Sequence, residues 1–317
     1  MSIEKLSLSI FNSYCSHALS KPAMCANLTR LLIILTASSY LPQYQRMISK
    51  GSSTGISPIY VFINNLVALV QFTVFLEYAA LVHNGVFHIP ESLMHSPPSV
   101  GDWLSIVQLG VSYLCASTFF FLWATYTPQR ILKLLLIFLW AAATTVCFAP
   151  CIYHATHAFR NPLELLPTFV DFLNLFMIPL CPLALIIATV AQNVEIDLNG
   201  PPQTLSTSTL LAQAVLYAVL AGSQAFRVQN DPDFWRRDGR SLALYLWLCW
   251  VCGWTTLDFG IFSIGQFVLY LRCVWIGRRE DTQAAQDYSA SETSPLLSTH
   301  SGAVDNRSVE GCHSGGE

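Results

Sequence analysis

The sequence predicts an all-α integral membrane protein with seven transmembrane helices. Of its 317 residues, 53% are hydrophobic and only 11% are charged, whereas an ordinary soluble domain carries about a quarter charged residues. A helix that crosses a bilayer needs about 20 mostly apolar residues. Seven stretches meet this requirement: Leu28–Met47, Pro58–Val82, Trp103–Tyr126, Ile131–Tyr153, Phe169–Ala191, Thr207–Ala225 and Trp247–Trp275.

The last stretch and the two ends of the chain differ from the rest. The apolar sequence over 242–276 is longer than one membrane span needs. Either it is one long helix, or Gly253 or Gly260 divides it into a segment at the membrane interface and a spanning helix. Segment 1–27 mixes charged and polar residues, so we expect the first spanning helix, and not a cleaved signal peptide, to target the chain. Segment 277–317 is rich in Ser, Gly, Thr and acidic residues, which predicts a disordered tail.

The cysteines and the charges favour neither a metal site nor a nucleic-acid site. Most cysteines of the apolar stretches stand alone, as packing thiols do, and the pair Cys249 and Cys252 is too small for a zinc site, which needs about four ligands. The basic residues are scattered and form no stripe. We therefore expect no metal, no cofactor and no nucleic acid. The cysteines in question are Cys115, Cys147, Cys181, Cys249, Cys252 and Cys273.

An internal repeat relates the two halves of the chain. A shift of 149 residues places Gln43 on Gln192 and Ser57 on Ser206, so the spacing of fourteen residues from glutamine to serine occurs twice. The same shift places Gly51 on Gly200, Ile56 on Leu205 and Asn64 on Gln213. Transporters built from repeated helical units hold their substrate where the units meet.

The residues around the first glutamine resemble a known signature. Leu41, Pro42 and Gln43, followed by "STGISP" over 53–58, resemble the motif of the PQ-loop family, which includes cystinosin, the lysosomal and vacuolar cationic amino acid exporters and, more distantly, the SWEET sugar transporters. The second copy, Ala191-Gln192, lacks the proline and resembles a degenerate motif. "LDFGIFSIGQFVLY" resembles the family's last helix and supplies Asp258, Gln266 and Tyr270.

The resemblance implies a 3+1+3 arrangement. A first three-helix repeat at 28–126 and a second at 162–276 are joined by a linking helix within 127–161. It also implies a transporter of a small polar metabolite that works by alternating access and is coupled to protons. Cationic amino acids are the leading substrate class by resemblance alone.

Pro42 has two readings. Proline lacks an amide hydrogen and crowds the carbonyl four residues earlier, here that of Ser38, so Pro42 is either a hinge or a static kink. Gln43 offers donors and an acceptor to backbone or substrate. Gly55 permits a tight turn, and Ser57-Pro58 is typical of an N-cap followed by the first helical residue.

Polar side chains inside the spans suggest a path. Ionisable groups at membrane depth usually face a cavity or a partner, so Asp258, Asp171 and Glu77 are candidates for proton coupling, although the last two can also lie at the membrane interfaces. The alternative role for each amide is hydrogen bonding between helices, worth about 1 kcal/mol. The expected substrate path comprises Asn64, Gln71, Tyr78, Gln213, Tyr217, Gln224, Gln266 and Tyr270.

Orientation and location depend on the tail. Arginine and lysine are balanced between the two sides, so the charge rule does not decide. "SETSPLL" has Glu292 before Leu296 and Leu297, the spacing of an acidic dileucine sorting signal, which a cytosolic adaptor recognises. We therefore expect a cytosolic C-terminus and a vacuolar or lysosomal membrane.

Two other functions remain open at this stage. A membrane-embedded enzyme, such as an integral-membrane cyclase, would use Glu77, Asp171 and Asp258 as acid and base. A seven-helix sensor or scaffold would keep the fold without transport.

Overall fold

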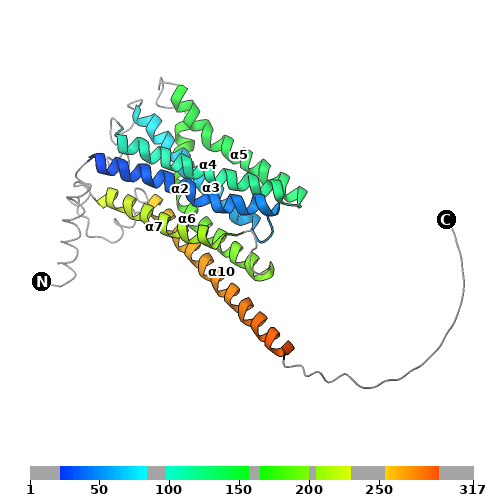
Figure 1. The fold of residues 1–317 in the computed structure, drawn as a ribbon. Coiled ribbons are helices and arrows are strands. Elements are labelled where there is room, and N and C mark those ends of the chain that lie inside the picture. Colours follow the sequence, from blue (N-terminus) through cyan, green and yellow to red (C-terminus); the bar gives the residue numbers. More distant parts are fainter. Residues whose placement is uncertain (1–21, 84–97, 157–164, 200–204, 230–253, 293–317) are drawn as a thin grey trace, which may run out of the picture. The chain divides into compact units, whose positions relative to one another are not determined.

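A computed structural model describes residues 22–83, 98–156, 165–199, 205–229 and 254–292, and its regular structure there is entirely helical (Figure 1). The helices are α2 (Pro22–Lys50), α3 (Pro58–His83), α4 (Val100–Tyr126), α5 (Arg130–Thr156), α6 (Leu165–Asn199), α7 (Thr207–Gln229) and α10 (Trp254–Glu292). Each coincides with one of the seven predicted stretches. The beginning of the seventh stretch lies outside the described residues.

Five of these helices are long and apolar enough to cross a membrane, so the chain is a helical membrane protein. They are α3, α4, α5, α6 and α10. In the described part of the chain, α2 and α7 are not among the helices that meet this criterion, and these two helices pack against each other. Several of their polar side chains are buried within the protein, among them Gln43 of α2 and Gln213 of α7, as expected where polar groups bond between helices.

The tail differs from its prediction. The chain divides into two units, 1–276 and 277–317, at the boundary expected from composition. However, α10 continues to Glu292, so 277–292 is helical where disorder was expected. Arg, Glu, Gln and Ala are good helix formers, and extending an existing helix avoids the unfavourable nucleation step.

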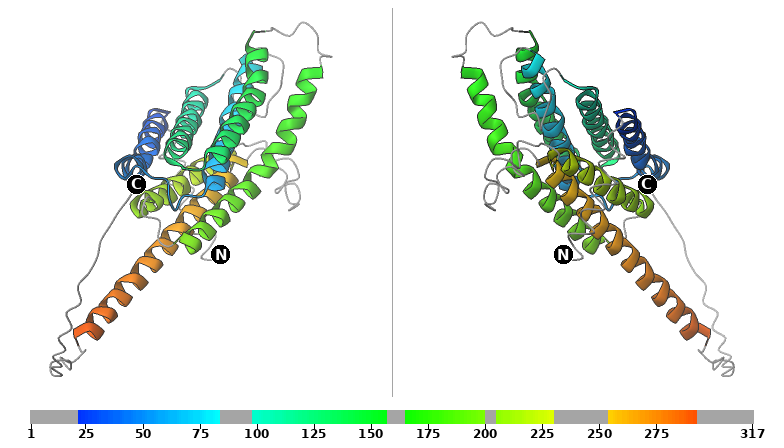
Figure 2. Two further views of the ribbon diagram at one scale, coloured as in Figure 1. Left: turned by 90° about the vertical axis from the view of Figure 1, so that its right-hand side faces the viewer. Right: turned by 90° about the vertical axis from the view of Figure 1, so that its left-hand side faces the viewer.

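The helices of the first unit follow one contact pattern. The helix α4 packs against both α2 and α3. The helix α10, orange in Figure 2, lies beside α6 and α7. The Ser263 hydroxyl of α10 donates to the Ala214 carbonyl of α7 at 2.6 Å, and Gly265 of α10 meets Thr189 of α6. We call α2, α3 and α4 the N-terminal group, and α6, α7 and α10 the C-terminal group. Between these groups, α2 packs on α7 and α3 packs on α6. The first helix of each group therefore contacts the second helix of the other group.

The helix α5 lies against the N-terminal group. Phe148 of α5 packs its ring on Phe72 of α3 and Tyr113 of α4, at centroid distances of 6.1 and 6.3 Å. The Cys151 thiol donates to the Thr73 carbonyl at 3.3 Å. Little of the spanning part of α5 is buried within the protein, as expected for a helix whose outer face contacts lipid.

The turn after α2 forms as its sequence predicts. Gly51 and Gly55 have φ values of 58° and 79°, a region that favours glycine. Pro58 is the first residue of α3, and the Ser57 hydroxyl accepts from the Tyr60 amide at 3.5 Å. The turn therefore ends α2 and starts α3 within seven residues, 51–57.

Candidate functional site

The two glutamines of the internal repeat make reciprocal contacts. Gln43 Oε1 accepts a hydrogen bond from the Ser206 amide at 2.9 Å, and Gln192 Oε1 accepts one from the Ser57 amide, also at 2.9 Å. Gln192 Nε2 in addition donates to the Gly55 carbonyl at 2.8 Å. Both glutamine side chains are buried. Each glutamine thus satisfies an N-terminal amide that the helix of the other half leaves without an intrahelical partner.

The helix boundaries follow the same repeat. Lys50 ends α2 and Asn199 ends α6, while Pro58 begins α3 and Thr207 begins α7; both pairs are 149 residues apart. The Ser206 hydroxyl accepts from the amide two residues after the start of α7 at 3.4 Å, as Ser57 does at the start of α3.

One of the two glutamine contacts between the halves is accompanied by a further hydrogen bond. Arg46 Nη1 donates to the Leu205 carbonyl at 2.7 Å, beside the contact between Gln43 and Ser206. The corresponding position in the second half, 149 residues later, is Glu195. A carboxylate cannot donate a hydrogen bond, so the contact of Gln192 with the first half lacks an equivalent of the bond that Arg46 makes.

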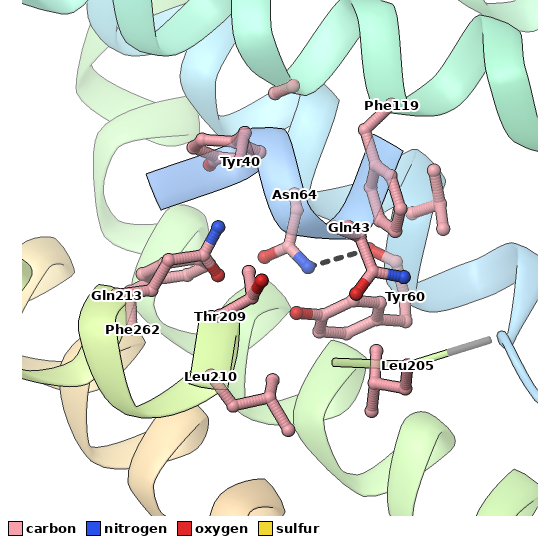
Figure 3. Close-up of a pocket in the computed structure, with 12 residues that line it drawn as sticks. Tyr40, Gln43, Tyr60, Asn64, Phe119, Leu205, Thr209, Leu210, Gln213 and Phe262 are labelled. Carbon is pink, nitrogen blue, oxygen red and sulfur yellow. Dashed lines mark hydrogen bonds between the residues drawn. The ribbon is translucent and has the colours of Figure 1, made fainter. Parts of the chain in front are cut away.

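A cavity lies beside Gln43, between α2, α3, α4, α7 and α10 (Figure 3). We call it the outer cavity because its lining reaches Leu205, just before the start of α7. About 20 Å³ of it is open to the centre of a water-sized sphere. Thr209 Oγ1 is buried there without a hydrogen-bond partner among the described residues. The polar residues of its lining are Tyr40, Gln43, Tyr60, Asn64, Thr209 and Gln213.

An inner cavity contains Asp258. Its space open to the centre of a water-sized sphere is about 30 Å³. Asp258 is fully buried, and its Oδ2 accepts from Gln71 Nε2 at 2.9 Å, while Oδ1 has no hydrogen-bond partner in the described part of the chain. The lining includes Gln71, Ser112, Tyr217 and Asp258, and it shares Tyr40, Asn64, Ala116 and Phe262 with the outer cavity.

The two cavities are too small for a metabolite. A single water needs about 10–15 Å³ measured in this way, so 20 and 30 Å³ admit only one or a few waters each. Passage of any larger solute requires the helices to separate.

Five of the residues proposed for path or proton coupling line these cavities: Asn64, Gln71, Gln213, Tyr217 and Asp258. Gln266 lines neither, but its Nε2 donates to the Tyr60 hydroxyl at 2.8 Å and so fixes a side chain of the outer cavity. The motif residue Pro42 lies half-buried inside α2, which continues through it.

The other predicted residues lie elsewhere. Tyr78 and Tyr270 pack against the two hydrophobic cores, Gln224 is half-buried, and Glu77 is buried in α3; none of them lines either cavity. The side chain of Asp171 lies outside the described residues. So does the sorting motif, apart from the backbone of Glu292 at the end of α10.

Four polar lining residues were missed by the sequence analysis: Tyr40, Tyr60, Ser112 and Thr209. The repeat itself contained a signal for two of them, since Tyr60 and Thr209 are 149 residues apart and each follows its capping serine by three. Ser112 is four residues after Gln108 on α4, the spacing of one helix face.

Comparison of the chain with protein-family models, curated proteins and solved structures gives no match.

Proposed function

We propose that the chain is a PQ-loop-type transporter that moves a small polar metabolite by alternating access. In this proposal all seven helices span the membrane, and two three-helix repeats, 28–126 and 162–276, rock about the linking helix at 127–161. The observation that carries the proposal is the reciprocal contact of Gln43 and Gln192 with the backbone of the opposite half. Equivalent contacts in opposite directions are expected where two repeats of one unit meet about a pseudo-two-fold axis.

The glutamine contacts act as a gate on the side of the two turns. Ser206, just before α7, and Gly55, just before α3, are each bonded to a glutamine of the other half. Opening this side breaks both contacts together. Pro42, one residue before Gln43, lowers the free energy needed to bend α2 there, because it removes a helical hydrogen bond.

Asp258 couples transport to protons in this proposal. A buried carboxylate is unfavourable in its charged form unless it is fully hydrogen-bonded, and Asp258 has one oxygen bonded and one without a partner in the described residues. That oxygen is available to carry a proton. The same carboxylate in a polar cavity supports a cationic substrate, and cationic amino acids remain the leading class.

The location follows from the tail. We assign the protein to a vacuolar or lysosomal membrane with a cytosolic C-terminus, where Glu292, Leu296 and Leu297 bind a sorting adaptor. With seven spans, this orientation places both glutamine-held turns on the cytosolic side.

Reconstitution tests the transport function. Purified protein in lipid vesicles is assayed for uptake of radiolabelled lysine, arginine, histidine and a set of neutral amino acids, with and without a pH gradient. We expect uptake of at least one solute that requires the protein and increases with the gradient. Absence of all uptake by folded protein contradicts the proposal and favours a sensor or scaffold, while chemical conversion of a solute without a gradient favours an enzyme.

A further inference from the structure

Two tyrosine hydroxyls meet at the boundary between the cavities. Tyr40 of α2 and Tyr217 of α7 lie with their hydroxyl oxygens 3.3 Å apart, and either can be the donor. Both side chains are buried. Tyr217 lines the inner cavity. Tyr40, which Figure 3 shows in the outer cavity, lines both cavities. The pair therefore joins the two spaces by a hydrogen bond.

Each cavity also contains a buried oxygen without a partner among the described residues: Asp258 Oδ1 in the inner one and Thr209 Oγ1 in the outer one. Buried polar groups of folded proteins are nearly always hydrogen-bonded, often to ordered water. Both cavities have room for at least one water, which needs about 10–15 Å³. The site thus offers acceptors for water on either side of the tyrosine pair.

We propose that Tyr217 and Tyr40, together with water in the two cavities, relay the transported proton between Asp258 and the outer cavity. This inference rests on the proposed proton-coupled function. The protonated carboxyl gives its proton through inner water to the Tyr217 oxygen, while Tyr217 passes its own hydroxyl proton to the Tyr40 oxygen. Tyr40 then releases its original proton to water beside Thr209. One proton enters the pair and one leaves it, so neither tyrosine changes its charge.

Among the groups around Asp258, the hydroxyls of Tyr217 and Tyr40 are the ones suited to accept and pass on its proton. The neutral Gln71 faces it from α3, the Cys181 thiol from α6, a serine hydroxyl from α4, and the two tyrosines from α2 and α7. None of the described residues that line this cavity is basic. Gln71 already donates to the carboxylate. Two polar residues of this cavity, Tyr40 and Asn64, also line the outer cavity. The Asn64 amide donates to the Tyr60 carbonyl at 2.8 Å and cannot both accept and release a proton as a hydroxyl does.

A deuterium-exchange experiment on the full chain tests the relay without a substrate. Infrared difference spectroscopy follows the protonated carboxyl band that Asp258→Asn removes, after rapid mixing of acidic proteoliposomes with D₂O. Tyr217→Phe and Tyr40→Phe each keep the ring and remove the hydroxyl, and we expect both to slow deuteration of the band about a hundredfold. Tyr44→Phe is the matched control, because its hydroxyl bonds the Cys115 carbonyl and it lines neither cavity.

Deuteration at the wild-type rate in Tyr217→Phe overturns the relay, as does a wild-type spectrum that contains no Asp258-dependent carboxyl band at any acidic pH. The fold of each variant is checked by size exclusion; the Tyr217 ring packs on Phe262 at 4.5 Å between centroids, a contact that phenylalanine retains.

A transport assay separates the relay from the function on which it rests. Tyr217→Phe is expected to reduce gradient-driven uptake about a hundredfold and solute exchange at equal pH by a much smaller factor, because only gradient-driven uptake requires net movement of a proton through the pair. Equal loss of both activities in a folded variant overturns the relay, because the hydroxyl would then serve the solute. If the wild-type protein moves no solute in either assay, the proposed transport function fails, and the deuterium experiment alone decides the relay.

Discussion

Gln192 holds two backbone groups of the opposite turn, the Ser57 amide and the Gly55 carbonyl, and Gln43 holds the Ser206 amide in the same way 149 residues earlier. The amide group is suited to this because it presents a donor and an acceptor side by side. Two such contacts in opposite directions link the halves at both turns. In this conformation, Gln43 and Gln192 therefore bind backbone groups of the protein.

Replacing Gln192 by leucine should destabilise the protein. The change leaves the buried Ser57 amide and Gly55 carbonyl without their glutamine partner, and each such group costs about 1–3 kcal/mol. Denaturant or thermal unfolding in detergent measures the loss. Asn193→Ala is the control, since the Asn193 amide bonds only the Thr189 carbonyl of its own helix among the contacts described. Equal stability of the two variants would remove the structural role of Gln192.

The contact of Gly265 in α10 with Thr189 in α6 makes a second prediction. A Cβ added to Gly265 would lie 2.5 Å from Thr189 Oγ1, so Gly265→Ala should destabilise by about 1–3 kcal/mol through overpacking. The additional change Thr189→Ala removes the obstructing oxygen and should restore stability. Gly260→Ala, in the same helix with nothing within 4 Å of the new Cβ, should be neutral or stabilising. Unfolding of the four proteins decides; destabilisation that persists in the double variant contradicts the packing argument.

Hydropathy predicted the helices because it is a local property of the sequence. The positions of Pro58 and Thr207 at two helix starts follow from a serine, a turn and an apolar run in each half. The pairing of Asp258 with Gln71 could not be predicted from the sequence, because it depends on the position of α10 along the length of α3. Helical spacing alone gives the face of a residue but not its depth relative to a partner helix.

Depth also explains why Tyr78 and Gln224 are not in the site. Tyr78 shares a face with Asn64 and Gln71, but it lies seven residues beyond Gln71, about 10 Å farther along the helix, where the cavity has ended. Gln224 is likewise seven residues beyond Tyr217.

Removal of the dileucine pair should redirect the protein. A tagged full-length chain with Leu296→Ala and Leu297→Ala is expected at the cell surface, because the adaptor loses both aliphatic side chains that it recognises. Fluorescence microscopy with a vacuolar or lysosomal marker measures the shift. Val304→Ala removes another aliphatic group from the same tail and should not move the protein. Unchanged residence of the dileucine variant takes the motif out of the localisation argument.

The proline before Gln43 should control the rate of opening. Pro42→Ala allows a hydrogen bond to the Ser38 carbonyl, worth about 1 kcal/mol, so solute exchange should slow about fivefold to tenfold while equilibrium binding is retained. Ala191→Pro introduces the same break into α6, where a half-buried alanine stands at the matching position, and should speed opening of the second half if that half is the slow one. Exchange by Pro42→Ala at the wild-type rate would show that the proline is a static kink.

Asp258→Asn should uncouple uptake from the pH gradient and leave the fold intact. The amide keeps the shape of the carboxylate and an oxygen that can accept from Gln71 Nε2, but it cannot bind and release a proton. We expect gradient-driven uptake to fall at least about tenfold, and by a larger factor than exchange at equal pH. Asp197→Asn is the matched control, because Asp197 pairs with Arg272 on an exposed surface, 51% accessible, and lines neither cavity. If Asp258→Asn keeps the wild-type dependence on pH, the proton binds elsewhere, and Glu77, buried in α3, is the next carboxylate to replace by its amide.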